Sequence, residues 1–198
     1  MTRPDFNDTG STVFACLKTV DFLKPLCEGG SREIDKVPVV ERHIGRFNTA
    51  EEVKRWLSNR DGAIRVAVLN VEQYEKIGGR VIGTVNMAAY VFASDKFGYS
   101  KDTRVEAIAG KVAAAMMTQG GPPQAYAKAE RVRADNLYSG SSDDLGVAFW
   151  AVSWTQKWYL DVPLDLATLD DFLRFNLRGE LADGAPELEG DVNLPQGD

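Results

Sequence analysis

Apolar residues recur at helical spacing in four parts of the chain. They predict helices over residues 13–27, 49–57, 103–117 and 168–175. Pro25 and the pair Gly29-Gly30 are expected to end the first helix. Thr49-x-x-Glu52 and Thr103-x-x-Glu106 are capping boxes, so they mark the starts of the second and third helices.

Five other segments have the β-branched and aromatic content, or the alternation, that is typical of strands. They cover residues 37–47, 63–71, 80–93, 127–138 and 147–159. Gly78-Gly79 and the polar stretch 140–146 connect consecutive strands through tight turns. Tight turns favour antiparallel pairing, so the pattern predicts an α+β fold: a mainly antiparallel sheet with helices packed on one side.

The last of these strands holds three tryptophans at a spacing of four. A strand places Trp150, Trp154 and Trp158 on one face. Two interpretations are open at this point. The rings fill the core of the monomer, or the far end, at Trp158 and Tyr159, packs on a partner, because aromatic residues are enriched in interfaces.

Charge separates the C-terminal end from the rest of the chain. The net charge of the 198 residues is −6, and residues 179–198 contain six acidic and no basic residues. The preceding part is therefore neutral and has no basic stripe for gripping nucleic acid. We expect a flexible N-terminus over residues 1–12, a single α+β domain over 13–178, and an acidic, irregular tail over 179–198.

The sequence offers little that would support catalysis or metal binding. His43 is the only histidine, and no Gly-x-Ser-x-Gly elbow accompanies it. Gly110-Lys111 lacks the following Ser or Thr of a phosphate loop. The carboxylates Asp135, Asp143 and Asp144 match no calcium-loop spacing and read as an ordinary turn. We therefore expect no catalytic residue, cofactor or metal.

From cysteine usage and hydropathy we expect the product to stay soluble in the cytosol. Cys16 and Cys27 are eleven residues apart, which fits no zinc pair, and both lie in an apolar helical stretch where buried free thiols are common. The N-terminus has no basic start followed by an apolar run, and no apolar stretch is long enough to cross a bilayer.

Two stretches of the chain are distinctive when taken together. One is Val85-Asn-Met-Ala-Ala-Tyr-Val-Phe-Ala-Ser-Asp with the capped helix after it. The other is Ala134-Asp-Asn-Leu-Tyr-Ser-Gly followed by Gly146-Val-Ala-Phe-Trp-Ala-Val-Ser-Trp. In this order they resemble tail terminator proteins of Mu-like tailed bacteriophages. In that family a strand leads into a polar loop, a helix and a hairpin whose last strand has a similar tryptophan pattern. The resemblance spans residues 13–160.

The resemblance implies a structural virion protein without enzymatic activity. Six copies would form a ring at the head-proximal end of the tail tube, end its polymerisation and offer a surface to the head–tail connector or stopper protein. The implied partners are other copies of the chain, the tube protein and the connector, while DNA passes through the ring without sequence-specific binding. Assembly would take place in the host cytoplasm without a membrane.

Two other classes of function stay open at this stage. One is a different neck or tail ring component, such as a connector or tube-like protein. The other is a small-ligand-binding protein or enzyme with an unrecognised site. As interface candidates the sequence offers Lys96, Phe97, Tyr99 and Lys101, in the loop from Ser94 to Asp102. The alternative for this loop is a local turn with Phe97 tucked onto its own domain.

Overall fold

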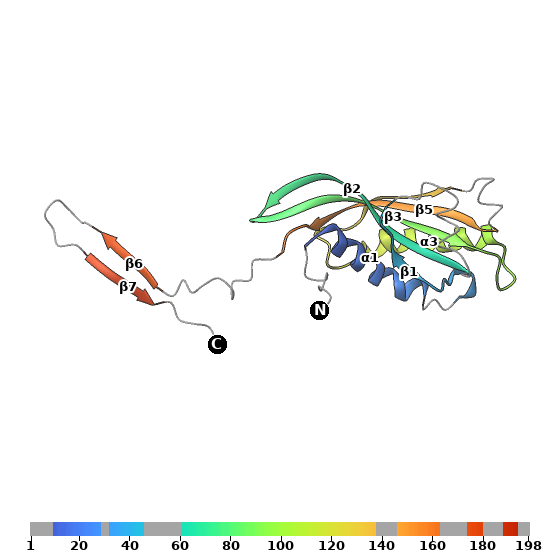
Figure 1. Cartoon of the computed structure of the whole chain (residues 1–198), viewed down its shortest axis with the longest axis horizontal. Helices are drawn as coiled ribbons and strands as arrows, with labels where there is room; N and C mark the ends of the chain where they lie inside the picture. Colours follow the sequence, from blue (N-terminus) through green and yellow to red (C-terminus); the bar gives the residue numbers. More distant parts are fainter. Residues whose placement is uncertain are drawn as a thin grey trace. The chain divides into compact units, whose positions relative to one another are not determined.

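The structure is a computed structural model. It describes residues 10–28, 32–45, 61–137 and 146–162, together with the two strands at 174–179 and 188–193. The labels follow Figure 1, and the elements in chain order are α1 (Thr12–Cys27), the 3-10 helix η1 (Glu33–Asp35), β1 (Val40–Arg42), β2 (Gly62–Ile77), β3 (Arg80–Ala93), α3 (Lys101–Gln119), β4 (Glu130–Asn136), β5 (Ala148–Tyr159), β6 (Arg174–Gly179) and β7 (Leu188–Asn193).

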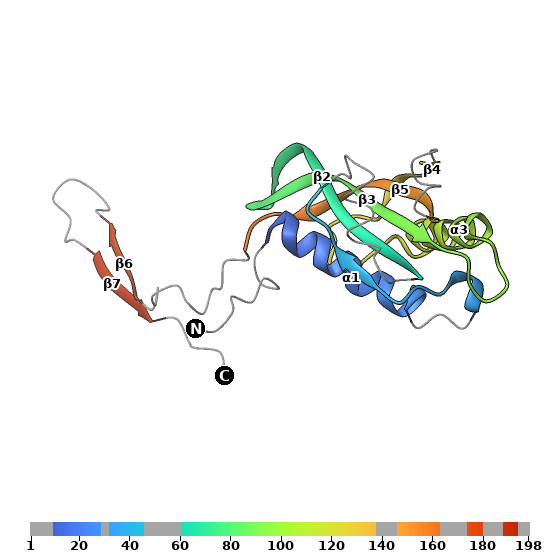
Figure 2. The same cartoon turned by 45° about the vertical axis from the view of Figure 1, so that its right-hand side comes forward.

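A five-stranded sheet organises residues 10–162. Its strand order is β1-β2-β3-β5-β4, and only the β1–β2 pair is parallel. Figures 1 and 2 show α1 and α3 on the same face of this sheet. The predicted α+β class, with a mainly antiparallel sheet and helices on one side, is therefore confirmed.

The hairpin of β2 and β3 is the longest feature of the sheet. Ile77 pairs with Arg80 around Gly78 and Gly79, whose φ angles of 58° and 82° suit glycine. The predicted strand 63–71 is too short, because β2 continues to the turn. Figure 1 shows the hairpin extending past the part of the sheet that α1 covers.

The main core lies between the helices and the inner face of the sheet. Alternate residues of β3 point into it, among them Val85, Met87, Ala89 and Val91. Trp154 and Trp158 of β5 lie in the same core, and Trp150 packs against it. The prediction that the three tryptophans share one face is confirmed by these contacts.

Trp158 is not an interface residue of this domain. Its side chain is fully buried, and its ring meets the ring of Phe14 of α1 edge to face at 6.3 Å. The prediction that Trp158 packs on a partner is therefore wrong, since the inner face of β5 belongs to the core of the chain itself.

The outer face of the sheet carries a smaller apolar cluster and a polar ladder. Phe92 stacks on Phe149 at 4.5 Å between ring centres, beside Tyr90. Further along the strands, the Asn86 side chain donates to Asn70 Oδ1 at 2.9 Å and accepts from the Thr155 hydroxyl at 2.8 Å. The hydrogen bonds join β2, β3 and β5 through side chains as well as backbone.

The ends of the two long helices differ in detail from the prediction. Pro25 lies inside α1, in its last turn, and does not end it. The N-cap of α3 is Ser100, three residues before the predicted Thr103, and their hydroxyls lie 2.8 Å apart. Gly120 ends α3, because its φ of 79° is a left-handed conformation that glycine adopts without strain.

Two predicted strands occur where the sequence placed them but are shorter than predicted. The stretch 37–47 contributes only the three residues of β1, and 127–138 contributes β4 over Glu130–Asn136. The predicted helix 49–57, the turn 140–145 and the predicted helix start at Thr168 lie outside the described residues.

The chain divides into two compact units, Met1–Val162 and Pro163–Asp198. In the second unit β6 and β7 pair antiparallel, with Phe175 opposite Val192. The expectation of helix at Phe175 is therefore wrong, and residues 188–193 are a strand within the segment expected to be irregular. Among the described helices none is both long and apolar enough to span a membrane.

Candidate functional site

The loop between β3 and α3 is built around a two-residue turn. Lys96 and Tyr99 exchange backbone hydrogen bonds of 3.1 and 3.0 Å across it. Phe97 and Gly98, at the tip, both have positive φ angles, 55° and 79°. Positive φ at both central positions is the signature of a type I′ turn, which is tight and rigid but prefers Asn or Gly where this chain has Phe97.

Arg104 of α3 fixes the base of this loop. Its Nη1 donates to the carbonyls of Asp61 and Ser94 at 2.8 and 2.7 Å, and its Nη2 donates to the carbonyl of Lys36 at 2.9 Å. Burial lowers the pKa of the Arg104 guanidinium below its ordinary value. An arginine nevertheless stays charged at neutral pH, so one buried cation ties the loop to two distant segments.

Two further contacts hold the flanks of the turn. The Lys96 ammonium pairs with the carboxylate of Asp61, at the start of β2. The backbone N–H of Lys101 donates to Asp95 Oδ1 at 2.6 Å, which satisfies one of the free amides at the start of α3. The loop is thus held on both sides of its tip, at Ser94 and Lys96 before it and at Lys101 after it.

The aromatic side chains of the loop stay accessible despite this anchoring. Phe97 is 45% exposed and Tyr99 is 42% exposed. The Phe97 ring lies 5.0 Å from the Lys96 ammonium and 5.9 Å from the Arg104 guanidinium. The ring therefore leans on its own domain without being covered by it.

A cleft of about 220 Å³ lies beside the first turns of α3, which contribute Lys101 to its lining. Its apolar part is formed by Val105, Ala148 and Trp150, and its polar part includes Asp102 and Glu106. This cleft could not be predicted from the sequence. It forms where α3 packs beside the β4–β5 edge, and no local sequence pattern indicates that packing.

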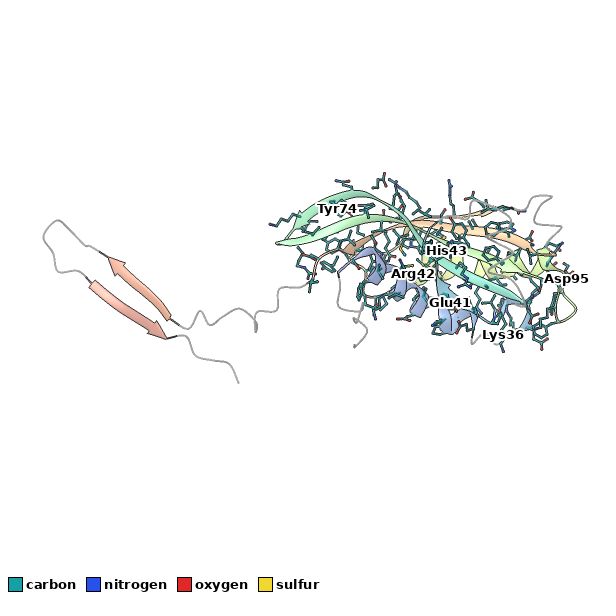
Figure 3. The ribbon with its side chains drawn as sticks, viewed as in Figure 1. Lys36, Glu41, Arg42, His43, Tyr74 and Asp95 are labelled. Atoms are coloured by element: carbon teal, nitrogen blue, oxygen red, sulfur yellow. The ribbon has the colours of Figure 1, made fainter. Side chains whose placement is uncertain are left out.

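The predicted interface residues do not form one site. Lys96, Phe97, Tyr99 and Lys101 follow the end of β3, whereas Tyr159 is in register with Ile82, near the β2–β3 turn. Figure 3 shows the same separation, with Asp95 and Tyr74 at opposite ends of the sheet.

Tyr159 belongs to a separate cluster at the hairpin end. Its ring lies 4.5 Å from the Arg80 guanidinium and 5.4 Å from the ring of Tyr126. Arg80 also pairs with Asp161 at 2.9 Å, and this hydrogen bond holds the pKa of the Asp161 carboxyl below its usual value. Tyr159 is half-buried by these contacts, so Phe97 and Tyr99 are the more accessible pair.

The residues that the sequence analysis weighed for catalysis or ligand binding are buried or paired within the fold. Burial raises the pKa of both Cys16 and Cys27 to about 11, which makes them poor nucleophiles at neutral pH. Lys111 lies mid-helix and pairs with Asp35 at 3.2 Å. His43 is buried at the end of β1.

Metal ligands do not gather in the part of the chain that the structure describes. No group of three or more acidic, histidine or cysteine side chains suited to a metal occurs there. Asp135 pairs with Arg133 at 3.1 Å, while Asp143 and Asp144 lie outside the described residues.

No protein-family model matches the chain, and the search of curated proteins found no match.

Proposed function

We propose that this chain is a tail terminator of the type found in Mu-like tailed bacteriophages. Six copies form a ring on the head-proximal end of the tail tube, stop tube growth and present a surface to the head–tail connector. The protein acts through surfaces and carries out no reaction.

The order of elements around the sheet carries this proposal. The long strand β3 leads into the polar, aromatic loop, then into α3, then into the β4–β5 pair with its row of tryptophans. This is the order on which the resemblance rests. The rigid loop with exposed aromatic rings adds a second point, because such side chains suit contacts between proteins.

Electron microscopy of the full chain, alone and co-expressed with the tail tube protein, tests the proposal. We expect six-fold rings, and tubes of defined length with one ring at one end. On assembled particles, gold-labelled copies should lie where the tail meets the head. Label at the distal tip or along the tube would contradict the terminator function, and label on the head side of the joint would assign the chain to the connector instead.

A further inference from the structure

We propose that Phe97 of one copy inserts into the cleft between α3 and β5 of a second copy. The inference rests on the proposed ring, because it names the contact through which neighbouring copies join. The two halves of the contact are two neighbouring but separate surfaces of the same domain, since the cleft is also lined by Lys101 and Asp102, which follow the loop.

The first half is an aromatic side chain held in an unfavourable conformation. With a φ of 55°, Phe97 occupies a backbone region that residues with a Cβ rarely adopt. Its anchored flanks keep it there, although 45% of the side chain stays exposed. Strain that the surrounding structure maintains is typical of residues that contact a ligand or partner. Phe97 is therefore pre-organised for a contact outside its own chain.

The second half is a cleft of matching size and chemistry. Its volume is about 220 Å³, and an apolar protein cavity of roughly 150 Å³ accommodates benzene. Trp150 offers a ring against which a phenyl group packs favourably, beside Val105 and Ala148. By volume, the cleft is large enough to receive a phenyl group.

Charge favours the same pairing. Lys96 carries its ammonium 5.0 Å from the Phe97 ring, so a docked ring brings a cation with it. The exposed carboxylates Asp102 and Glu106 line the receiving cleft together with one cation, Lys101, so its charged lining is acidic on balance. Opposite charges at the edge of an interface fix its orientation and speed association.

The loop and the cleft are different surfaces, so the contact between two copies is head to tail. Contacts to Asp61 and Lys36 tie the loop to the β1–β2 side of the domain. The cleft is lined by Asn136 of β4 and Trp150 of β5, which lie across β3 from β2 in the sheet order. A contact between two different surfaces repeats from copy to copy, and it closes into a ring when the rotation fits. A second copy of the chain is therefore the occupant that this geometry favours.

Thiol cross-linking between two variants tests the contact directly. We would label Tyr99→Cys and Glu106→Cys chains, which both keep the Phe97 ring, with different tags, mix them and add a short bis-maleimide reagent. The native Cys16 and Cys27 are buried, so they stay unreactive. We expect a covalent heterodimer in the mixture at least tenfold above the covalent dimer of either variant alone. Equal yields in all three samples would overturn the inference, and so would self-linking of Tyr99→Cys, since that would indicate a symmetrical contact.

A second variant separates docking from folding. Asn tolerates positive φ, so Phe97→Asn should melt no more than a few degrees from wild type and yet assemble at least tenfold less well. Tyr126→Ala, which removes a ring of 40% exposure at the other end of the sheet, is the matched control and should assemble normally. Normal rings from Phe97→Asn would refute the contact and leave the proposed function standing. Cross-linking without any ring would refute the ring and leave the contact standing.

Discussion

At the scale of single residues, Arg104 joins three separate segments of the chain. Its guanidinium meets carbonyls from residues that are 68, 43 and 10 positions away in the sequence. The hydrogen bonds to these carbonyls are partly buried, and a buried carbonyl left unsatisfied costs roughly 1–3 kcal/mol. Arg104 therefore couples the loop of Phe97 to the fold as a whole.

Arg104→Lys should destabilise the domain although it keeps the charge. An ammonium cannot reproduce the planar fork that reaches three carbonyls, so we expect a loss of about 3 kcal/mol in the free energy of unfolding. Urea denaturation measures this loss. Arg133→Lys is the control, because Arg133 is exposed. A change below about 1 kcal/mol for Arg104→Lys would show that water takes over the carbonyls.

Phe97 allows a test of the strain in the turn. Asn and Ala both remove the ring, but Asn adopts a left-handed conformation more readily than Ala does. Phe97→Asn should therefore exceed Phe97→Ala by about 1 kcal/mol in the free energy of unfolding. Urea denaturation of the two variants measures the difference. Equal stability would mean that the turn relaxes to negative φ when the ring is gone.

At the scale of elements, α1 is held to the sheet by an apolar face that includes both cysteines. Cys16 donates its thiol to the carbonyl of Val66 at 3.1 Å, and Cys27 is fully buried. Desolvation by burial raises the pKa of each thiol from 9.0 to about 11. The neutral thiols are thus part of the packing between α1 and the sheet.

These pKa values predict a loss of stability at alkaline pH. Between pH 9 and 11 the unfolded chain releases thiol protons that the folded chain retains, so stability falls as pH rises through this window. Replacing both residues by Ala should reduce the slope of the melting temperature against pH there. Other groups titrate in both proteins alike, so the comparison isolates the thiols. Identical slopes would place the folded pKa values near 9.

The elements that the sequence predicted well are those with a strong local period. The helices α1 and α3 and the strands β3 and β5 repeat apolar residues often enough to be recognised. The length of β1 was overestimated because a parallel edge strand ends where its pairing with β2 ends. The candidate site was predicted only in part. Exposed aromatic residues were identified at Phe97 and Tyr99, but the Arg104 clamp and the cleft depend on contacts between distant segments.

At the scale of the whole molecule, the chain combines a neutral body with an acidic end. The unit that ends at Val162 contains the five-stranded sheet and both long helices, and the unit from Pro163 contains the β6–β7 pair. Two short strands alone are marginally stable in water. The stability of the body should therefore come from its own core.

Truncation after Val162 tests this independence. The melting temperature of the body should change by less than about 2 °C, the shift that corresponds to under 1 kcal/mol in a domain of this size. Calorimetry of the truncated and full chains gives the comparison. If the truncated chain also forms rings as well as the full chain does, the acidic end only aids solubility, and if rings fail while melting is unchanged, it is an assembly element.

A second truncation, after Tyr159, is the matched control because it removes three more residues that do have contacts in the body. Leu160 donates its backbone N–H to the carbonyl of Val81 at 2.9 Å, and Asp161 accepts from Arg80 and from the N–H of Val81 at 2.9 Å each. Their loss frees the turn end of the β2–β3 hairpin, so the melting temperature should fall by several degrees relative to the truncation after Val162. Equal melting of the two truncated chains would show that the hairpin is held by β5 alone. A large fall already at Val162 would instead place part of the core beyond that residue.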